Sequence, residues 1–119
     1  MRAAIATKGG PTAYDEGLAQ ILRDDLAGEP FRERKMFGGL CFLIAGNMVA
    51  GVYPGGGMFR VAKADRASAL EVPGAEEIRM GARVMGGMIG LSPAAMGDDA
   101  ARGRLMALAL AHVRRLPPK

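Results

Sequence analysis

Few side chains in this sequence are suited to chemistry. His112 is the one histidine and Cys41 the one cysteine. His112 falls in a helical pattern with no serine, cysteine or carboxylate nearby in sequence to complete a triad or a metal site. Cys41 lies within an apolar run, where a thiol behaves as a small hydrophobic group rather than as a reactive thiolate. We therefore expect no catalytic residue, no metal ligand and no enzymatic activity.

Two further patterns resemble sites but have simpler explanations. The adjacent acidic pairs Asp24-Asp25, Glu76-Glu77 and Asp98-Asp99 cannot act as paired acids, because neighbouring side chains point to opposite faces of a strand or about 100° apart on a helix. The run Gly55-Gly56-Gly57 lacks the lysine and hydroxyl residue of a phosphate-binding loop and precedes a strand. We expect no bound cofactor.

Basic residues gather in one part of the chain. The protein has 16 lysine and arginine residues against 12 aspartate and glutamate residues, which gives a net charge of +4. The segment over residues 30–66 accounts for that excess. Its candidates for contact with a partner or a phosphate are Arg32, Arg34, Lys35 and Arg60. These residues form either an interface for an anionic partner or a solvated strand face.

The composition is that of a small globular protein. With 119 residues, half of them hydrophobic, the chain can bury a core of its own. Its longest apolar run, residues 40–45, is far shorter than the ~20 residues of a membrane-spanning helix. Residues 3–6 are too few for the apolar core of a signal peptide. We expect a cytoplasmic protein that does not enter a membrane, and the single cysteine fits a reducing compartment.

The spacing of apolar residues predicts alternating helices and strands. Residues 1–12 show no period and are expected to be a disordered extension, followed by one domain over residues 13–119. Thr12 and Asp15 are typical of a helix start, as are Ser92-Pro93 and Asp98-Asp99. The expected helices cover residues 12–26, 66–70 and 98–115. The expected strands cover residues 31–36, 40–45, 48–53, 58–62, 77–80 and 85–91.

A central hairpin organises these strands. Gly46-Asn47 separates two apolar runs and predicts a two-residue turn, because Gly and Asn tolerate a positive φ. Gly38-Gly39 is expected to bend or bulge the entering strand. The element order predicts an α+β two-layer sandwich, with an antiparallel sheet of five to six strands and helices on one face. Because the strands are apolar on both faces, we expect a cover on the second face, with a homodimer interface as the favoured one.

The hairpin also carries a family resemblance. Residues 35–42, KMFGGLCF, followed by Gly46-Asn47-Met48, resemble the signature of the TfoX/Sxy N-terminal domain family. The similarity extends over roughly residues 13–119. It implies a fold like that of secretion chaperones and a role in regulating natural competence and transcription. Full-length members carry a second, C-terminal domain. Met88, Gly90 and Leu105 stand where the family usually has aromatic residues.

Three functions are compatible with these observations. The first is a non-enzymatic regulatory module that contacts a protein partner through the sheet face and its basic edge. The second is a nucleic-acid-binding module that uses the basic strand region, for which a steep salt dependence of duplex binding would be the sign. The third is a small-molecule-binding domain, which an apolar pocket containing Cys41 would favour.

Overall fold

A computed structural model describes residues 14–36 and 38–119 of the protein. The expected disordered extension over residues 1–12 lies outside the described residues. Six strands form one antiparallel sheet in the order β1-β2-β3-β4-β6-β5. They are β1 (Phe31–Met36), β2 (Gly39–Ile44), β3 (Asn47–Tyr53), β4 (Gly56–Arg60), β5 (Ala75–Met80) and β6 (Arg83–Leu91).

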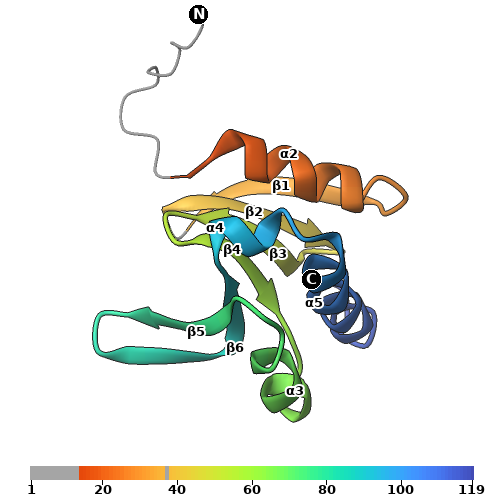
Figure 1. The fold of residues 1–119 in the computed structure, drawn as a ribbon. Coiled ribbons are helices and arrows are strands. Elements are labelled where there is room, and N and C mark those ends of the chain that lie inside the picture. The colour runs from red at the N-terminus through yellow and green to blue at the C-terminus, as the bar shows by residue number, and fades with distance from the viewer. Residues whose placement is uncertain (1–13, 37) are drawn as a thin grey trace, which may run out of the picture.

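Helices pack against one face of this sheet and form the second layer (Figure 1). They are α2 (Glu16–Asp25), α3 (Arg66–Leu70), α4 (Pro93–Met96) and α5 (Asp99–Val113), and a 3-10 turn, η1 (Lys63–Asp65), precedes α3. This arrangement is the α+β two-layer sandwich that the element order predicts. The β1 strand lies at one edge of the sheet, as its charged residues indicate.

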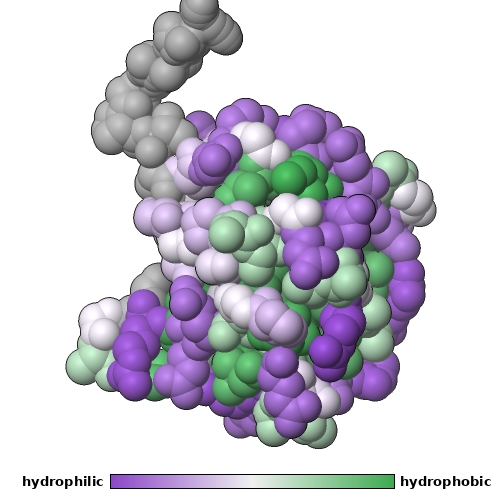
Figure 2. Space-filling view, in the orientation of Figure 1, coloured by the Kyte–Doolittle hydropathy of each residue, from purple (hydrophilic) through white to green (hydrophobic). Residues whose placement is uncertain are grey.

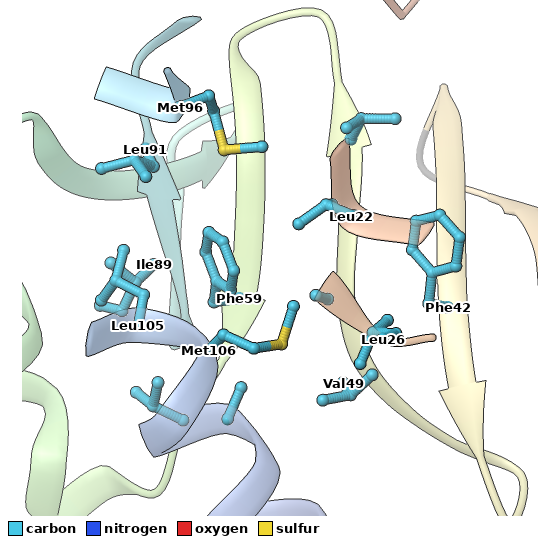
Figure 3. Close-up of a cluster of buried hydrophobic side chains, with 14 of the residues drawn as sticks. Leu22, Leu26, Phe42, Val49, Phe59, Ile89, Leu91, Met96, Leu105 and Met106 are labelled. Atoms are coloured by element: carbon cyan, nitrogen blue, oxygen red, sulfur yellow. The ribbon is translucent and has the colours of Figure 1, made fainter. Parts of the chain in front are cut away.

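The main core lies between the sheet and the helical layer. Phe42 on β2 and Phe59 on β4 are completely buried there, together with Leu22 of α2, Leu26 just after α2 and Leu105 of α5 (Figure 3). Burying one such side chain contributes about 1.5–3 kcal/mol of hydrophobic free energy. This core fixes the position of the strands, and none of the described helices packs on their other face.

Side-chain caps begin α2, α4 and α5, whereas Asp65 precedes α3 without a side-chain cap hydrogen bond. Asp15 accepts hydrogen bonds from the backbone N–H groups of Gly17, at 2.7 Å, and Leu18, at 3.3 Å, and so caps α2 by itself. Thr12, the residue expected to cap with it, lies outside the described residues. Ser92 caps α4 and Asp98 caps α5, as their positions in the sequence predict.

The central hairpin forms, but its turn comes one residue earlier than predicted. Ala45 and Gly46 connect β2 to β3, with φ values of 53° and 84°. Positive φ at both central residues is typical of a type I′ turn. Asn47 instead pairs with Ile44 in the sheet, and its side-chain Nδ2 donates to the backbone oxygen of Pro117 at 2.9 Å. The prediction of a Gly46-Asn47 turn is wrong because Asn47 binds the C-terminal segment.

Gly38-Gly39 does not bulge a strand. Gly38 has a φ of 70° and lies between β1 and β2, and Gly39 is the first residue of β2. The irregularity lies farther along, where the β2–β3 register pairs Phe42 with Ala50 and Leu43 with Met48. Val49 is the extra residue of this bulge. As a result, Val49 and Ala50 are both buried in the helix-facing core.

Candidate functional site

The second face of the sheet carries its own apolar cluster, which we call the open-face cluster. Its members come from strands β2 to β6, and none lies on a helix: Cys41, Leu43, Met48, Met58, Ile78 and Met88. Met36, Tyr53 and Met85 pack against it. The sheet is therefore apolar on both faces, as the strand sequences predict, and the described helices cover only one of them.

The sheet curls around the open-face cluster and forms a groove of about 760 Å³, the open-face groove. Residues of β1 and of β6 both line this groove, although four strand spacings, or about 19 Å, would separate these strands in a flat sheet. The β5–β6 hairpin extends on the side opposite α5 (Figure 1). Figure 2 shows this hairpin standing out at the lower left, with the molecular outline indented above it.

The groove combines an apolar floor with basic residues. Its methionines are Met36, Met48, Met85 and Met88. Its charged side chains are Arg34, Arg60, Arg83 and Lys119, and all four are cationic. None of the four forms an ion pair with a described residue. The groove is therefore suited to a ligand that is apolar at its centre and anionic at its margins.

Five arginines outside the groove have acidic partners among the described residues: Arg23, Arg66, Arg79, Arg102 and Arg114. Arg23 binds Glu16 and Glu33, and Arg102, which is 8% exposed, binds Asp25 and donates to the backbone oxygen of Met96. These contacts raise the pKa of both guanidinium groups, the hydrogen bonds to carboxylates being the main cause. Such arginines stabilise the fold, whereas the four groove cations can serve a ligand.

The structure brings two of the four predicted contact residues together in the groove, places a third on the same sheet face and the fourth on the other. Arg34 and Arg60 both line the open-face groove. Arg32 pairs with Leu43 of the open-face cluster and shares its face of the sheet. Lys35 pairs with Leu40 of the helix-facing core, so it lies on the opposite face. The proposed basic group is thus split by the alternation of side chains along β1.

Sequence reasoning missed the groove residues of β6 and of the C-terminus. Arg83 and Val84 lie in a part of β6 that the apolar pattern does not predict, because the expected strand begins at residue 85, and Lys119 is far away in sequence. Lys119 reaches the groove because its backbone N–H donates to the oxygen of Ala45 at 2.8 Å. No local pattern indicates a contact between such distant residues, so only the folded chain shows them together.

Tyr53 occupies space that a side chain at residue 90 would need. A Cβ on Gly90 would lie 2.9 Å from the Tyr53 hydroxyl oxygen and 3.2 Å from Cγ1 of Ile78. Burial raises the pKa of the Tyr53 hydroxyl, and the Glu76 carboxylate contributes to the rise. Gly90, which stands where the family resemblance implies an aromatic residue, thus makes room for the ring of Tyr53.

The two reactive residue types lie on opposite sides of the sheet. Cys41 is completely buried in the open-face cluster, and burial raises the pKa of its thiol to about 11. His112 lies on α5, in the helical layer. Burial, Arg60 and Arg115 lower the pKa of its imidazole, and Asp65 opposes them. The two side chains therefore cannot act as a nucleophile and its base.

Neither a metal cluster nor a membrane span is evident in the described part of the chain. Across residues 14–36 and 38–119, no group of three or more His, Cys, Asp or Glu side chains could hold a metal ion. Within the same residues, every helix is too short or too polar to cross a membrane.

The groove is not the apolar pocket containing Cys41 that would favour a small-molecule-binding domain. Cys41 lies beneath the groove, but the residues that line the groove do not include it.

Fold and site together define a two-layer α+β protein, in which the described helices cover one sheet face and the other face carries the open-face groove. The family model for the TfoX N-terminal domain matches residues 24–113, which is well over half of the sequence. This chain belongs to the TfoX N-terminal domain family. Comparisons with curated proteins and with solved structures gave no match. The similarity to secretion chaperones that the sequence resemblance implies stays a prediction.

Proposed function

We propose that this chain is a non-enzymatic regulatory module of the cytoplasm that binds a protein partner in the open-face groove. Membership of the TfoX N-terminal domain family supports a role of the kind associated with these regulators, in natural competence and transcription. The observation that carries the proposal is an apolar sheet face that no described helix covers. The members of the open-face cluster are at most 7% exposed, whereas Met36 and Met85 beside them in the groove are partly exposed. Apolar surface of this kind, framed by polar residues, is typical of interaction sites.

Two features support binding rather than catalysis. The Cys41 thiol is buried and has a raised pKa, so at neutral pH it is not the thiolate that nucleophilic attack requires. His112 lies in the other layer of the sandwich. The groove itself offers guanidinium groups, an ammonium group and thioethers, which bind ligands well but rarely transfer protons near neutral pH.

Site-specific photocrosslinking in cells that express the protein tests this proposal. Gly86 lines the groove, and a Cβ placed on it meets nothing within 4 Å, so a photoreactive benzoylphenylalanine fits there. Gly103 on α5 has the same open space and lies in the helical layer. We expect residue 86 to yield a discrete protein crosslink that residue 103 does not. Identical products at the two positions, or none, would contradict the proposal.

Nucleic-acid binding is the second candidate, and the four groove cations favour it. A labelled duplex titrated at low and physiological salt would then bind at roughly 10 μM or tighter and weaken steeply with salt. Arg34→Ala should weaken this binding, whereas Lys35→Ala, on the opposite face, should change it little. Equal effects of the two substitutions would place the phosphate contacts outside the groove.

A further inference from the structure

We infer that the occupant of the open-face groove is an acidic segment of a partner protein that inserts a few apolar side chains between the groove cations. This inference rests on the proposed function and specifies the chemistry of the partner. The signs of the charges, the nature of the floor and the size of the groove each point to such a segment.

The charges select an anionic ligand. Arg34 comes from β1, Arg60 from β4, Arg83 from β6 and Lys119 from the C-terminal segment, so the cations surround the groove on several elements. No acidic side chain lines the groove with them among the described residues. Carboxylates of a partner would meet guanidinium groups that can bind them in a bidentate manner.

The methionines of the groove favour apolar side chains of a protein partner over the bases of a nucleic acid. Methionine side chains are flexible and polarisable, so a methionine-rich surface adapts to different apolar groups. Nucleic-acid bases would instead need aromatic side chains for stacking. None of the described residues that line the groove is aromatic.

The size of the groove selects a segment rather than a domain. Its volume of about 760 Å³ lies within the range of pockets that enclose a ligand of ordinary size. Several side chains fit there, but a folded domain does not. Gly46, Gly86 and Gly87 leave parts of the wall without side chains, so a peptide backbone can approach closely.

A second copy of this chain fits the groove less well. In a symmetric dimer the same surface of each subunit faces its counterpart. If two grooves faced one another, Arg34, Arg60, Arg83 and Lys119 would meet the same four cations. Like charges brought together at an interface are unfavourable, so the charges favour an acidic partner over a homodimer at this face.

Selection from a display library of random peptides tests the inference. The purified chain is the bait, and Gly86→Leu, whose new side chain occupies open space at the groove wall, is the counter-selection bait. We expect the enriched peptides to carry net negative charge and apolar anchors. Enrichment of neutral or basic peptides, or none that depends on the groove, would overturn the inference.

A synthetic copy of the most enriched peptide then gives a quantitative test by fluorescence anisotropy. Arg34→Gln should weaken binding roughly fivefold, the effect of one partly exposed charge pair. Lys35→Gln is the matched control, because the neighbouring residue lies on the other face, and it should leave affinity unchanged. Gly86→Leu should reduce binding of the peptide strongly, because residue 86 lines the groove. Gly103→Leu is its control, because residue 103 lies on α5, and it should reduce binding far less. Equal losses for Arg34→Gln and Lys35→Gln would overturn the assignment to the groove.

The results of crosslinking, peptide selection and light scattering distinguish a failure of this inference from a failure of the proposed function. If residue 86 crosslinks to a protein in cells but that protein contributes a basic or neutral segment, the acidic-segment inference fails and the proposed function stands. If light scattering shows a dimer that Gly86→Leu dissociates, a second copy occupies the groove and the inference is wrong. If residue 86 crosslinks to no protein in cells and no peptide depends on the groove, both fail.

Discussion

Cys41 is a core residue that happens to carry a thiol. It has no exposed surface, and burial raises its pKa to about 11. Because the thiolate is the reactive form, we expect Ellman's reagent to modify the native protein at neutral pH far more slowly than the unfolded chain. Measuring the reaction with and without denaturant checks this expectation. Rapid modification without denaturant would show that the open face fluctuates enough to expose the sulfur.

His112 should make the stability of the protein depend on pH. Burial, Arg60 and Arg115 lower the pKa of its imidazole in the folded protein, against the opposing effect of Asp65. The folded state therefore binds the proton less tightly than the unfolded chain, and protonation favours unfolding. This contribution to the free energy of unfolding is fully present above pH ~6.5 and is lost as the pH falls through the lowered pKa.

Urea unfolding of the protein and of His112→Gln at pH 7.5 and 5.5 measures this contribution. We expect the wild-type protein to lose stability between these two values and the variant to lose less. Carboxylates that titrate in the same range affect both proteins equally, so the difference isolates the histidine. An equal loss in both would show that His112 is not the group responsible.

Among the elements, the pairing of β2 with β3 depends on a glycine. A Cβ on Gly39 would lie 1.8 Å from the backbone oxygen of Val52 and 2.9 Å from the Cα of Tyr53. These backbone atoms belong to β3 and cannot move without separating β2 from β3. We expect Gly39→Ala to reduce the free energy of unfolding by about 3 kcal/mol, the upper end of overpacking effects.

Gly28→Ala is the matched control for this substitution. A Cβ on Gly28 meets nothing within 4 Å. A methyl group there should change stability by less than about 1 kcal/mol, with a small gain from the reduced freedom of the unfolded chain. Urea unfolding of both variants gives the comparison, and similar values for the two would contradict the role assigned to Gly39.

The elements were largely predictable because their signals are local. The charged residues of β1 predict an edge strand, and Ser92 before Pro93 predicts the start of α4, and the structure confirms both. The Gly46-Asn47 turn was wrong because a contact distant in sequence overrode a local preference. The turn uses Ala45 at a φ of 53°, and Asn47 is 3% exposed and bound to Pro117.

The candidate site was only partly predictable, because it is assembled from distant segments. Arg34 and Arg60 were identified from an excess of basic residues, which says nothing about the face each side chain occupies. Lys35 was grouped with them, yet the alternation along β1 places it on the helix-covered face. Arg83 and Lys119 join the groove only through the curl of the sheet and the course of the C-terminal segment.

In the molecule as a whole, some arginines hold the helices together and others line the open-face groove. Arg102 joins Asp25 at the end of α2, Asp99 of α5 and the backbone of Met96 in α4, so a single side chain links three helices. The groove cations make no such links among the described residues. Arg102 therefore fastens the helical layer, whereas the positive charges on the open face are available for a partner.

The C-terminal segment, residues 117–119, is hydrogen-bonded to the central hairpin between β2 and β3. Asn47 donates to the oxygen of Pro117, and the N–H of Lys119 donates to the oxygen of Ala45. Asn47 is nearly inaccessible to solvent, so its amide has few other partners. We expect Asn47→Ala to reduce the free energy of unfolding by about 1–2 kcal/mol, the effect of losing one hydrogen bond in a buried setting.

A double-mutant cycle assigns this loss to the C-terminal segment. Removing residues 117–119 deletes the acceptor, so Asn47→Ala should cost clearly less in the shortened protein than in the full chain. Urea unfolding of the four proteins gives the coupling. If the two changes are instead additive, Asn47 stabilises β3 without the tail, and Lys119 then reaches the groove by its own contact with Ala45 alone. A coupling comparable to the single-substitution loss would show that Asn47 holds the segment that carries Lys119 to the groove.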